Sequence, residues 1–163
     1  RDTYSTVINS ISISSSTKTI PISMGKRINA TFRLKTTDVV PASVNSLLVK
    51  IGTAGTNIPT NPTFDPSTGF ASALWKYSVN LTATPSEKFD RSIELLVQSD
   101  DTPYNITIDA YFGKTNLNDY TLTLEDVTLQ RSFQTIAEGA FFSRTGSTSF
   151  TFDETQGTHD IAY

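Results

Sequence analysis

The feature that most constrains this chain is the alternation of apolar and polar residues with a period of two. In residues 27–35, Ile28, Ala30, Phe32 and Leu34 alternate with basic and polar residues. Such alternation places the apolar side chains on one face of a β-strand. Amphipathic helical spacing is nearly absent, so the pattern predicts an all-β fold, an antiparallel β-sandwich of jelly-roll type. Similar segments, separated by turn residues, occur at 4–14, 20–23, 46–52, 74–83, 91–98, 105–112, 120–129 and 148–152.

The inward faces of these segments define the expected core. The alternation slips by one residue at Glu125 and Asp126, which predicts a β-bulge. Residues 132–140 are compatible with a short helix, and residues 53–70, rich in Gly and Pro, predict a long loop. The core is predicted to contain Ile28, Phe32, Leu34, Leu47, Val49, Ile51, Tyr77, Val79, Ile93, Leu95, Val97, Ile106, Ile108, Phe112, Leu122 and Leu124.

The length favours one domain covering residues 1–163. Its strong part spans about residues 5–130, and residues 131–163 look like a C-terminal appendage with a last strand. The chain opens at Arg1 without a Met or a signal peptide, so we expect it to be part of a longer protein.

The composition and charge of the chain disfavour several classes of partner and of chemistry. Ser, Thr and Asn account for 54 of 163 residues, with Thr the commonest, which indicates a polar β-rich surface. A net charge of −3 disfavours nucleic acid and anionic membranes as partners. No apolar run is long enough for membrane insertion. The chain has no Cys, so thiolate chemistry is excluded. Its single His is His159, so a catalytic site that needs several His residues cannot form and one that needs a single His has only this residue.

Three segments, in this order, resemble the jelly-roll carbohydrate-binding modules. They are the strand 26–35 (KRINATFRLK), the segment 75–82 (WKYSVNLT), and the closing strand 120–129 (YTLTLEDVTL). The second is similar to the family's Trp-x-x-Tyr-Ser-Val-x-hydrophobic-Thr strand. The chain departs from the family at Glu125, where Asp is more frequent. Modules of this kind occur as insertions in baseplate and distal tail proteins of phages that infect Gram-positive bacteria, and the composition resembles such an insertion.

The resemblance implies a structural calcium ion near Glu125 and Asp126, where these modules hold one. Carboxylates and backbone carbonyls suit such a hard cation. A bulge with two solvated acids is the alternative. No other cofactor is expected.

The candidate ligand-binding residues lie on the outward faces of mid-sheet strands. A concave sheet carrying them would offer amides, charges and one aromatic ring, which suits a saccharide. An ordinary solvated sheet face would carry the same residue types. Trp75 could stack on a sugar, but it is in phase with the apolar face and is more consistent with the core. The outward set is Arg33, Asn80, Glu94, Gln98, Asp109 and Tyr111.

Glu94 and Asp109 are the best pair of carboxylates for glycoside hydrolysis. Nothing beside them in the sequence indicates a raised pKa on either one, and acids on exposed strands are common. We therefore expect no enzyme activity.

The expected function is a non-catalytic carbohydrate-binding module. It would attach a larger, oligomeric parent protein, such as a phage tail or baseplate component, to cell-surface or cell-wall polysaccharide, while the isolated domain is a monomer. This predicts an extracellular or virion-surface location. The alternative is a structural or protein-binding β-sandwich domain of an adhesin or virion fibre.

Overall fold

The computed structural model describes residues 28–53, 63–71, 77–143 and 151–156, and all regular structure in these ranges is β-strand. Two of the predicted segments, 4–14 and 20–23, lie outside the described residues. The strands are β1 (Asn29–Val39), β2 (Ser46–Thr53), β3 (Phe64–Asp65), β4 (Phe70–Ala71), β5 (Tyr77–Thr82), β6 (Lys88–Leu96), β7 (Pro103–Phe112), β8 (Thr115–Thr128), β9 (Phe133–Gly139) and β10 (Thr151–Gln156).

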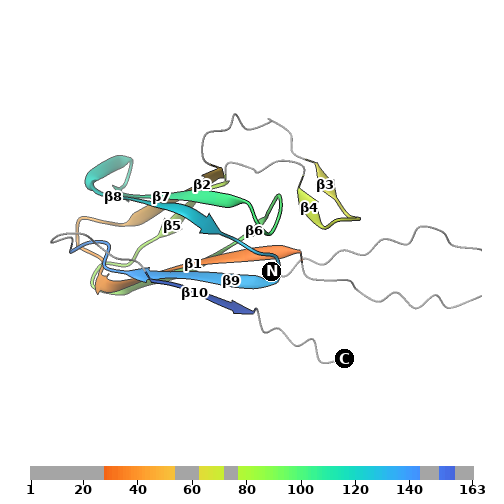
Figure 1. The fold of residues 1–163 in the computed structure, drawn as a ribbon. Helices are drawn as coiled ribbons and strands as arrows, with labels where there is room; N and C mark the ends of the chain where they lie inside the picture. The colour runs from red at the N-terminus through yellow and green to blue at the C-terminus, as the bar shows by residue number, and fades with distance from the viewer. Residues whose placement is uncertain (1–27, 54–62, 72–76, 144–150, 157–163) are drawn as a thin grey trace, which may run out of the picture.

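The strands form two four-stranded sheets packed face to face (Figure 1). The first sheet has the order β10–β9–β1–β6, and the second has the order β5–β2–β7–β8. A small hairpin, β3–β4, lies at one end of the sandwich, and the turn between β7 and β8 lies at the opposite end. The predicted all-β sandwich is confirmed.

One ladder differs from the antiparallel pairing expected throughout a jelly roll. Strand β9 pairs in parallel with β1, in register from Thr31 with Gln134 to Thr36 with Gly139. A parallel pair needs a crossover connection. Here the crossover is made through β8, which lies in the other sheet, so β9 enters the first sheet in the same direction as β1.

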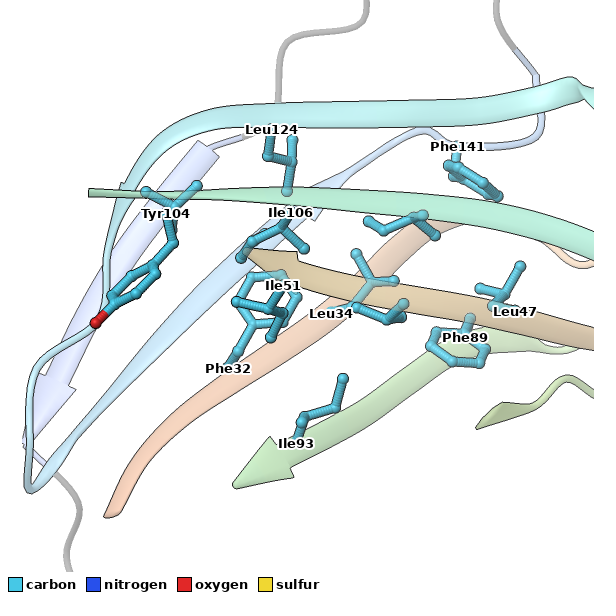
Figure 2. Close-up of a cluster of buried hydrophobic side chains, with 14 of the residues drawn as sticks. Phe32, Leu34, Leu47, Ile51, Phe89, Ile93, Tyr104, Ile106, Leu124 and Phe141 are labelled. Atoms are coloured by element: carbon cyan, nitrogen blue, oxygen red, sulfur yellow. The ribbon is translucent and has the colours of Figure 1, made fainter. Parts of the chain in front are cut away.

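The core lies between the sheets and is built from the inward faces of both (Figure 2). Twelve of the sixteen predicted core residues are buried, among them Phe32, Leu34 and Ile106 at 0% exposure. Val79 and Leu122 are half-buried and pack against the core. Phe112 is the clear error, because it is 55% exposed. The side chain of Tyr77 lies outside the described residues.

Residues 133–139 form a strand, so the helix predicted at 132–140 is wrong. Strand β9 is flanked by β1 and β10, and Ala137 and Phe141 are fully buried. The segment up to residue 143 is therefore an integral part of the sandwich rather than an appendage to it. Its inward residues in the strand, Thr135, Ala137 and Gly139, are small, so no apolar period-2 pattern marks it in the sequence.

The bulge predicted at Glu125 and Asp126 is confirmed. Tyr104 pairs with Val127 and Ile106 pairs with Leu124, so two steps along β7 match three along β8. Asp126 has a φ of 55°, a left-handed conformation typical of an extra residue in a bulge.

Part of the predicted long loop, 53–70, is structured. Phe64–Asp65 and Phe70–Ala71 form the β3–β4 hairpin, and the N–H of Ala71 donates to the carbonyl of Val97 just after β6. The hairpin is thereby joined to the end of the first sheet, and residues 54–62 lie outside the described part.

Candidate functional site

The six predicted ligand-binding residues do not share one face. Arg33 and Glu94 belong to β1 and β6 in the first sheet, whereas Asn80, Asp109 and Tyr111 belong to β5 and β7 in the second. Gln98 follows the end of β6 and lies in neither sheet. Because the two outward faces point away from each other, one ligand cannot lie across the whole set. Period-2 alternation identifies the face of a strand but not the sheet to which the strand belongs.

On the first sheet the outward charges are paired with one another. Arg33 binds Asp90 through two hydrogen bonds, Nε to Oδ1 and Nη2 to Oδ2, both of 2.7 Å. Lys35 Nζ lies 2.6 Å from Glu138 Oε2. Glu94 accepts a hydrogen bond of 3.2 Å from the amide of Asn29.

The pKa values on this face reflect the pairing. The hydrogen bonds to Asp90 raise the pKa of Arg33, and those same bonds from Arg33 lower the pKa of Asp90. Both partners are therefore held in their charged forms and are engaged with each other.

The second sheet does bring three of the predicted residues onto one outward face. Leu48 of β2 lies opposite both Asn80 of β5 and Asp109 of β7, and Asp109 lies opposite Thr121 of β8. Tyr111 lies two residues further along β7, and its hydroxyl accepts a hydrogen bond of 3.3 Å from the amide of Asn116. This face therefore combines amides, hydroxyls and one aromatic ring.

The charge of Asp109 is already neutralised within this face. Its Oδ2 lies 2.8 Å from Lys50 Nζ, and its Oδ1 accepts a hydrogen bond of 3.0 Å from the Thr121 hydroxyl. The hydrogen bond to Asp109 raises the pKa of Lys50. With its side chain only 7% exposed, Asp109 has little surface left for a ligand.

The pair of carboxylates considered for glycoside hydrolysis is separated. Glu94 lies in the first sheet and Asp109 in the second, on outward faces of opposite layers. A glycosidase needs its two acids on either side of one scissile bond. These two residues cannot be brought to one substrate.

A residue that the sequence interpretation assigned to the core lies at the surface instead. Phe112 ends β7 and lines an open pocket of about 320 Å³ together with Ala42, Ser43, Thr115 and Leu117. The pocket lies between the β1–β2 connection and the start of β8, at the end of the sandwich opposite the β3–β4 hairpin. In the sequence, the turn residue Gly113 could have indicated this exposure, because it marks Phe112 as the last residue of its strand. An inward-facing residue at that position can project beyond the core.

Tyr104, in contrast, offers no such surface. Trp75 lies outside the described residues. Tyr104 is fully buried, and its hydroxyl accepts the backbone N–H of Gln98 at 3.2 Å (Figure 2). Burial raises the pKa of the Tyr104 phenol. Tyr104 is thus a core residue that fixes the chain after β6.

The two predicted calcium ligands are both exposed in the β8 bulge. The N–H of Asp126 donates to Asn105 Oδ1 at 3.3 Å, so a protein contact supports the bulge. Among the described residues, no group of three or more His, Cys, Asp and Glu side chains is arranged to hold a metal ion. Calcium takes six to eight oxygen ligands, so a site here would need further oxygen atoms, such as backbone carbonyls, besides those of Glu125 and Asp126. The calcium ion stays a prediction, which equal melting temperatures in excess chelator and in excess calcium would contradict.

No helix in the described part of the chain is long and apolar enough to span a membrane.

No family model matches the chain. No curated protein matches it either. A crystal structure of a candidate cell adhesion protein from Bacteroides ovatus matches 86% of this chain with a TM-score of 0.49 and 15% sequence identity. The chain spans about half the length of that protein, 49% of which is covered.

Proposed function

We propose that this chain is a non-catalytic attachment module, a β-sandwich on the outside of a cell or virion that fastens its parent protein to a surface. The separation of Glu94 from Asp109 supports a role in binding rather than in catalysis. The polar surface, rich in Thr, Ser and Asn, suits an extracellular location.

The pairing of the outward charges is the observation that carries this proposal. Arg33, Lys35 and Lys50 each bind an acidic side chain of a strand in their own sheet. Side chains held in this way stiffen the two sheet faces, and they are poor ligand contacts because a ligand would have to replace existing bonds. Recognition then falls to the ends of the sandwich, where Phe112 lines its pocket.

We propose a cell-surface or cell-wall polysaccharide as the ligand and a phage tail or baseplate protein as the carrier. A neutral glycan is favoured, since the charges on the sheets satisfy one another. The second candidate is a structural or protein-binding sandwich of an adhesin or virion fibre. The same paired charges favour it, because stiff solvated faces suit a spacer between binding elements.

Attachment through one open pocket should be weak, with a Kd on the order of micromolar to millimolar. Useful attachment then requires many copies, since multivalency multiplies weak binding. We therefore propose an oligomeric parent protein, while the isolated domain stays a predicted monomer.

The test is to couple the chain at high density to fluorescent beads and to count beads bound to cells and to purified cell walls of the natural target. Beads carrying an unrelated β-sandwich are the control. We expect the chain to increase bead retention on both materials. Retention equal to the control on both would contradict the attachment role. Retention on intact cells that is lost on protein-free walls would favour the protein-binding candidate.

A further inference from the structure

The outer strands of the two four-stranded sheets differ in how they are protected against pairing with another chain. These strands are β10 and β6 in the first sheet and β5 and β8 in the second. An open strand edge pairs readily with a further strand unless charges, bulges or Pro residues interrupt it. Strand β6 carries Arg91 at an inward-facing position, opposite the buried Leu34. Strand β10 carries Asp153 and Glu154, and β8 has the bulge at Asp126, so three of these edges have such a feature.

Strand β5 is the outer strand that has none of these features. Its sequence, YSVNLT, contains no charged residue and no Pro, and its pairing with β2 has no break in register. Val79 and Leu81 pack against the core but are only half-buried. The residues that face outward, Ser78, Asn80 and Thr82, are exposed and uncharged. A strand added beside β5 would therefore cover apolar surface without burying a charge.

The backbone groups of every second residue of β5 point away from β2. The N–H of Ala83 donates to the carbonyl of Asn45 at 3.0 Å, directly beyond the end of the ladder between β2 and β5. In an antiparallel ladder, residues that bond to one neighbouring strand alternate with residues that bond on the other side. The odd-numbered residues of β5 therefore bond toward β2, whereas the even-numbered ones, Ser78, Asn80 and Thr82, direct their N–H and C=O groups to the open edge.

We propose that β5 pairs antiparallel with β5 of a second copy of this chain, across a two-fold axis at Asn80, so that the two second sheets join into one. In this register Asn80 lies opposite Asn80 of the second copy, and Ser78 lies opposite its Thr82. All the outward N–H and C=O groups of these residues are then bonded. On the inward face Val79 lies opposite Leu81 of the second copy, which is a favourable apolar pair.

A second copy is the occupant that the charge pattern favours. A two-fold axis sets an edge against its own sequence, so charged residues on or near the axis meet like charges. An axis at Arg91 of β6 would set Arg91 against itself, and an axis at Ser92 would set Asp90 against Glu94. Strand β5 meets its own copy with polar residues opposite polar residues, apolar opposite apolar, and no charge at the contact.

The pair is weak by itself. The six residues of β5 extend over about 20 Å, and contact through a single pair of strands is marginally stable in water. We expect a Kd on the order of 1 mM. The isolated domain is then a monomer in dilute solution, and pairing needs copies held at a high effective concentration, as in an oligomeric parent protein. The inference does not depend on what the chain attaches to.

The first test introduces a single Cys, which reports its own neighbours because the chain has no other. In a pair of Asn80→Cys chains, the two Cα atoms at this position would lie about 5.5 Å apart, a separation that a disulfide spans. Thr123→Cys is the matched control, because Thr123 is also exposed and lies on the outer strand β8. Under mild oxidation at about 1 mM chain, we expect Asn80→Cys to form disulfide-linked dimers roughly tenfold faster than Thr123→Cys.

The second test places charges on the two-fold axis. Asn80→Lys and Asn80→Asp each set like charges against each other, so each variant alone should pair about fivefold more weakly than the wild type. An equal mixture of the two variants should regain the lost strength, because opposite charges then meet. The measurement is the shift of the β5 backbone amide NMR signals as the chain concentration rises to about 2 mM. Thermal melts check that each variant folds, and the Cys variants give a second reading if one does not.

Equal rates of dimer formation by Asn80→Cys and Thr123→Cys would overturn the inference. So would a mixture of Asn80→Lys and Asn80→Asp that pairs no better than either variant alone. Wild-type β5 signals that do not shift with chain concentration would also overturn it. If those signals shift instead with an uncharged peptide that alternates threonine and valine, the edge takes a foreign strand rather than a second copy.

Discussion

The guanidinium of Arg131 lies over the ring of Phe70, with its central carbon 3.5 Å from the ring centroid. The same group donates to Asp100, with Nη2 2.8 Å from Oδ2, and to the carbonyl of Thr68 through Nη1 at 2.6 Å. Arg131 thus joins the β3–β4 hairpin, the β6–β7 connection and the chain between β8 and β9. One side chain fixes three segments at the end of the sandwich opposite Phe112.

Replacing Arg131 with Lys should destabilise the fold by about 1–3 kcal/mol, because an ammonium group cannot make the paired bonds to Asp100 and the stacking on Phe70 together. Urea unfolding measures the loss. Arg91→Lys is the control, since Arg91 is exposed and donates to the backbone carbonyl of Asp90, and it should change stability by less than about 0.5 kcal/mol. An equal effect of the two substitutions would contradict the fixing role of Arg131.

Asp38 should make the stability of the sandwich depend on pH. Its carboxylate accepts the backbone N–H groups of Phe141, Phe142 and Ser143 at 3.1, 2.6 and 2.7 Å. Partial burial acts to raise the Asp38 pKa, but these donors and the Ser143 hydroxyl outweigh it and lower the pKa. The stabilisation is therefore present above the unfolded value of about 3.9 and is lost as the pH falls through the folded pKa.

The measurement is the melting temperature of wild type and Asp38→Asn between pH 7 and pH 2. We expect the variant to be less stable by about 1–3 kcal/mol at neutral pH, because its amide N–H₂ group faces donors. The difference in melting temperature between the wild type and Asp38→Asn should narrow once the pH falls below about 4. A gap that stays constant over the whole range would show that the carboxylate charge does not matter.

Lys50 and Asp109 should be energetically coupled across β2 and β7. Lys50→Met leaves the nearly buried Asp109 without its cation. We expect the free energy of unfolding to fall by about 2 kcal/mol, a moderate loss because Lys50 itself is partly exposed. Asp109→Asn should restore part of that stability in the Lys50→Met background. A double-mutant cycle by chemical denaturation measures the coupling. Strictly additive effects would mean that the pair contributes nothing as a pair.

The bulge residue Asp126 should tolerate Gly but not Val. At a φ of 55°, Gly is unstrained, whereas a β-branched residue adds roughly 1–2 kcal/mol of strain. Asp126→Gly should therefore melt near the wild type in excess chelator, and Asp126→Val should melt several degrees lower. Equal melting temperatures of these two variants would contradict a left-handed conformation at this position.

The sequence predicts the strands and their inward faces well, because side-chain alternation is a local property. Phe32, Val49 and Ile108 are buried as predicted. Two other features, the sheet to which a strand belongs and the burial of its end residues, depend on contacts outside the strand itself. The sheet to which each strand belongs depends on long-range pairing, so alternation alone does not separate Arg33 from Asp109, which lie in opposite layers. The burial of a residue at a strand end depends on what lies opposite it, so alternation alone predicts Phe112 in the core although it is exposed.

Strand β9 illustrates a different reason for failure. Its buried residues, Thr135, Ala137 and Gly139, are small, and Gln134, Ala137 and Glu138 have intrinsic helix propensity. Tertiary pairing with β1 and β10 overrides that local preference.

The measurement that tests the attachment role and its location most directly compares bead retention on target cell walls for three forms of the chain. They are the wild type, Phe112→Ala at the pocket, and Asn80→Ala with Tyr111→Ala on the second sheet. We predict that wild-type beads are retained, that Phe112→Ala reduces retention to the level of an unrelated sandwich, and that the sheet variant behaves as the wild type. Loss of retention in the sheet variant alone, with Phe112→Ala unaffected, would contradict this account and place recognition on the face of the second sheet.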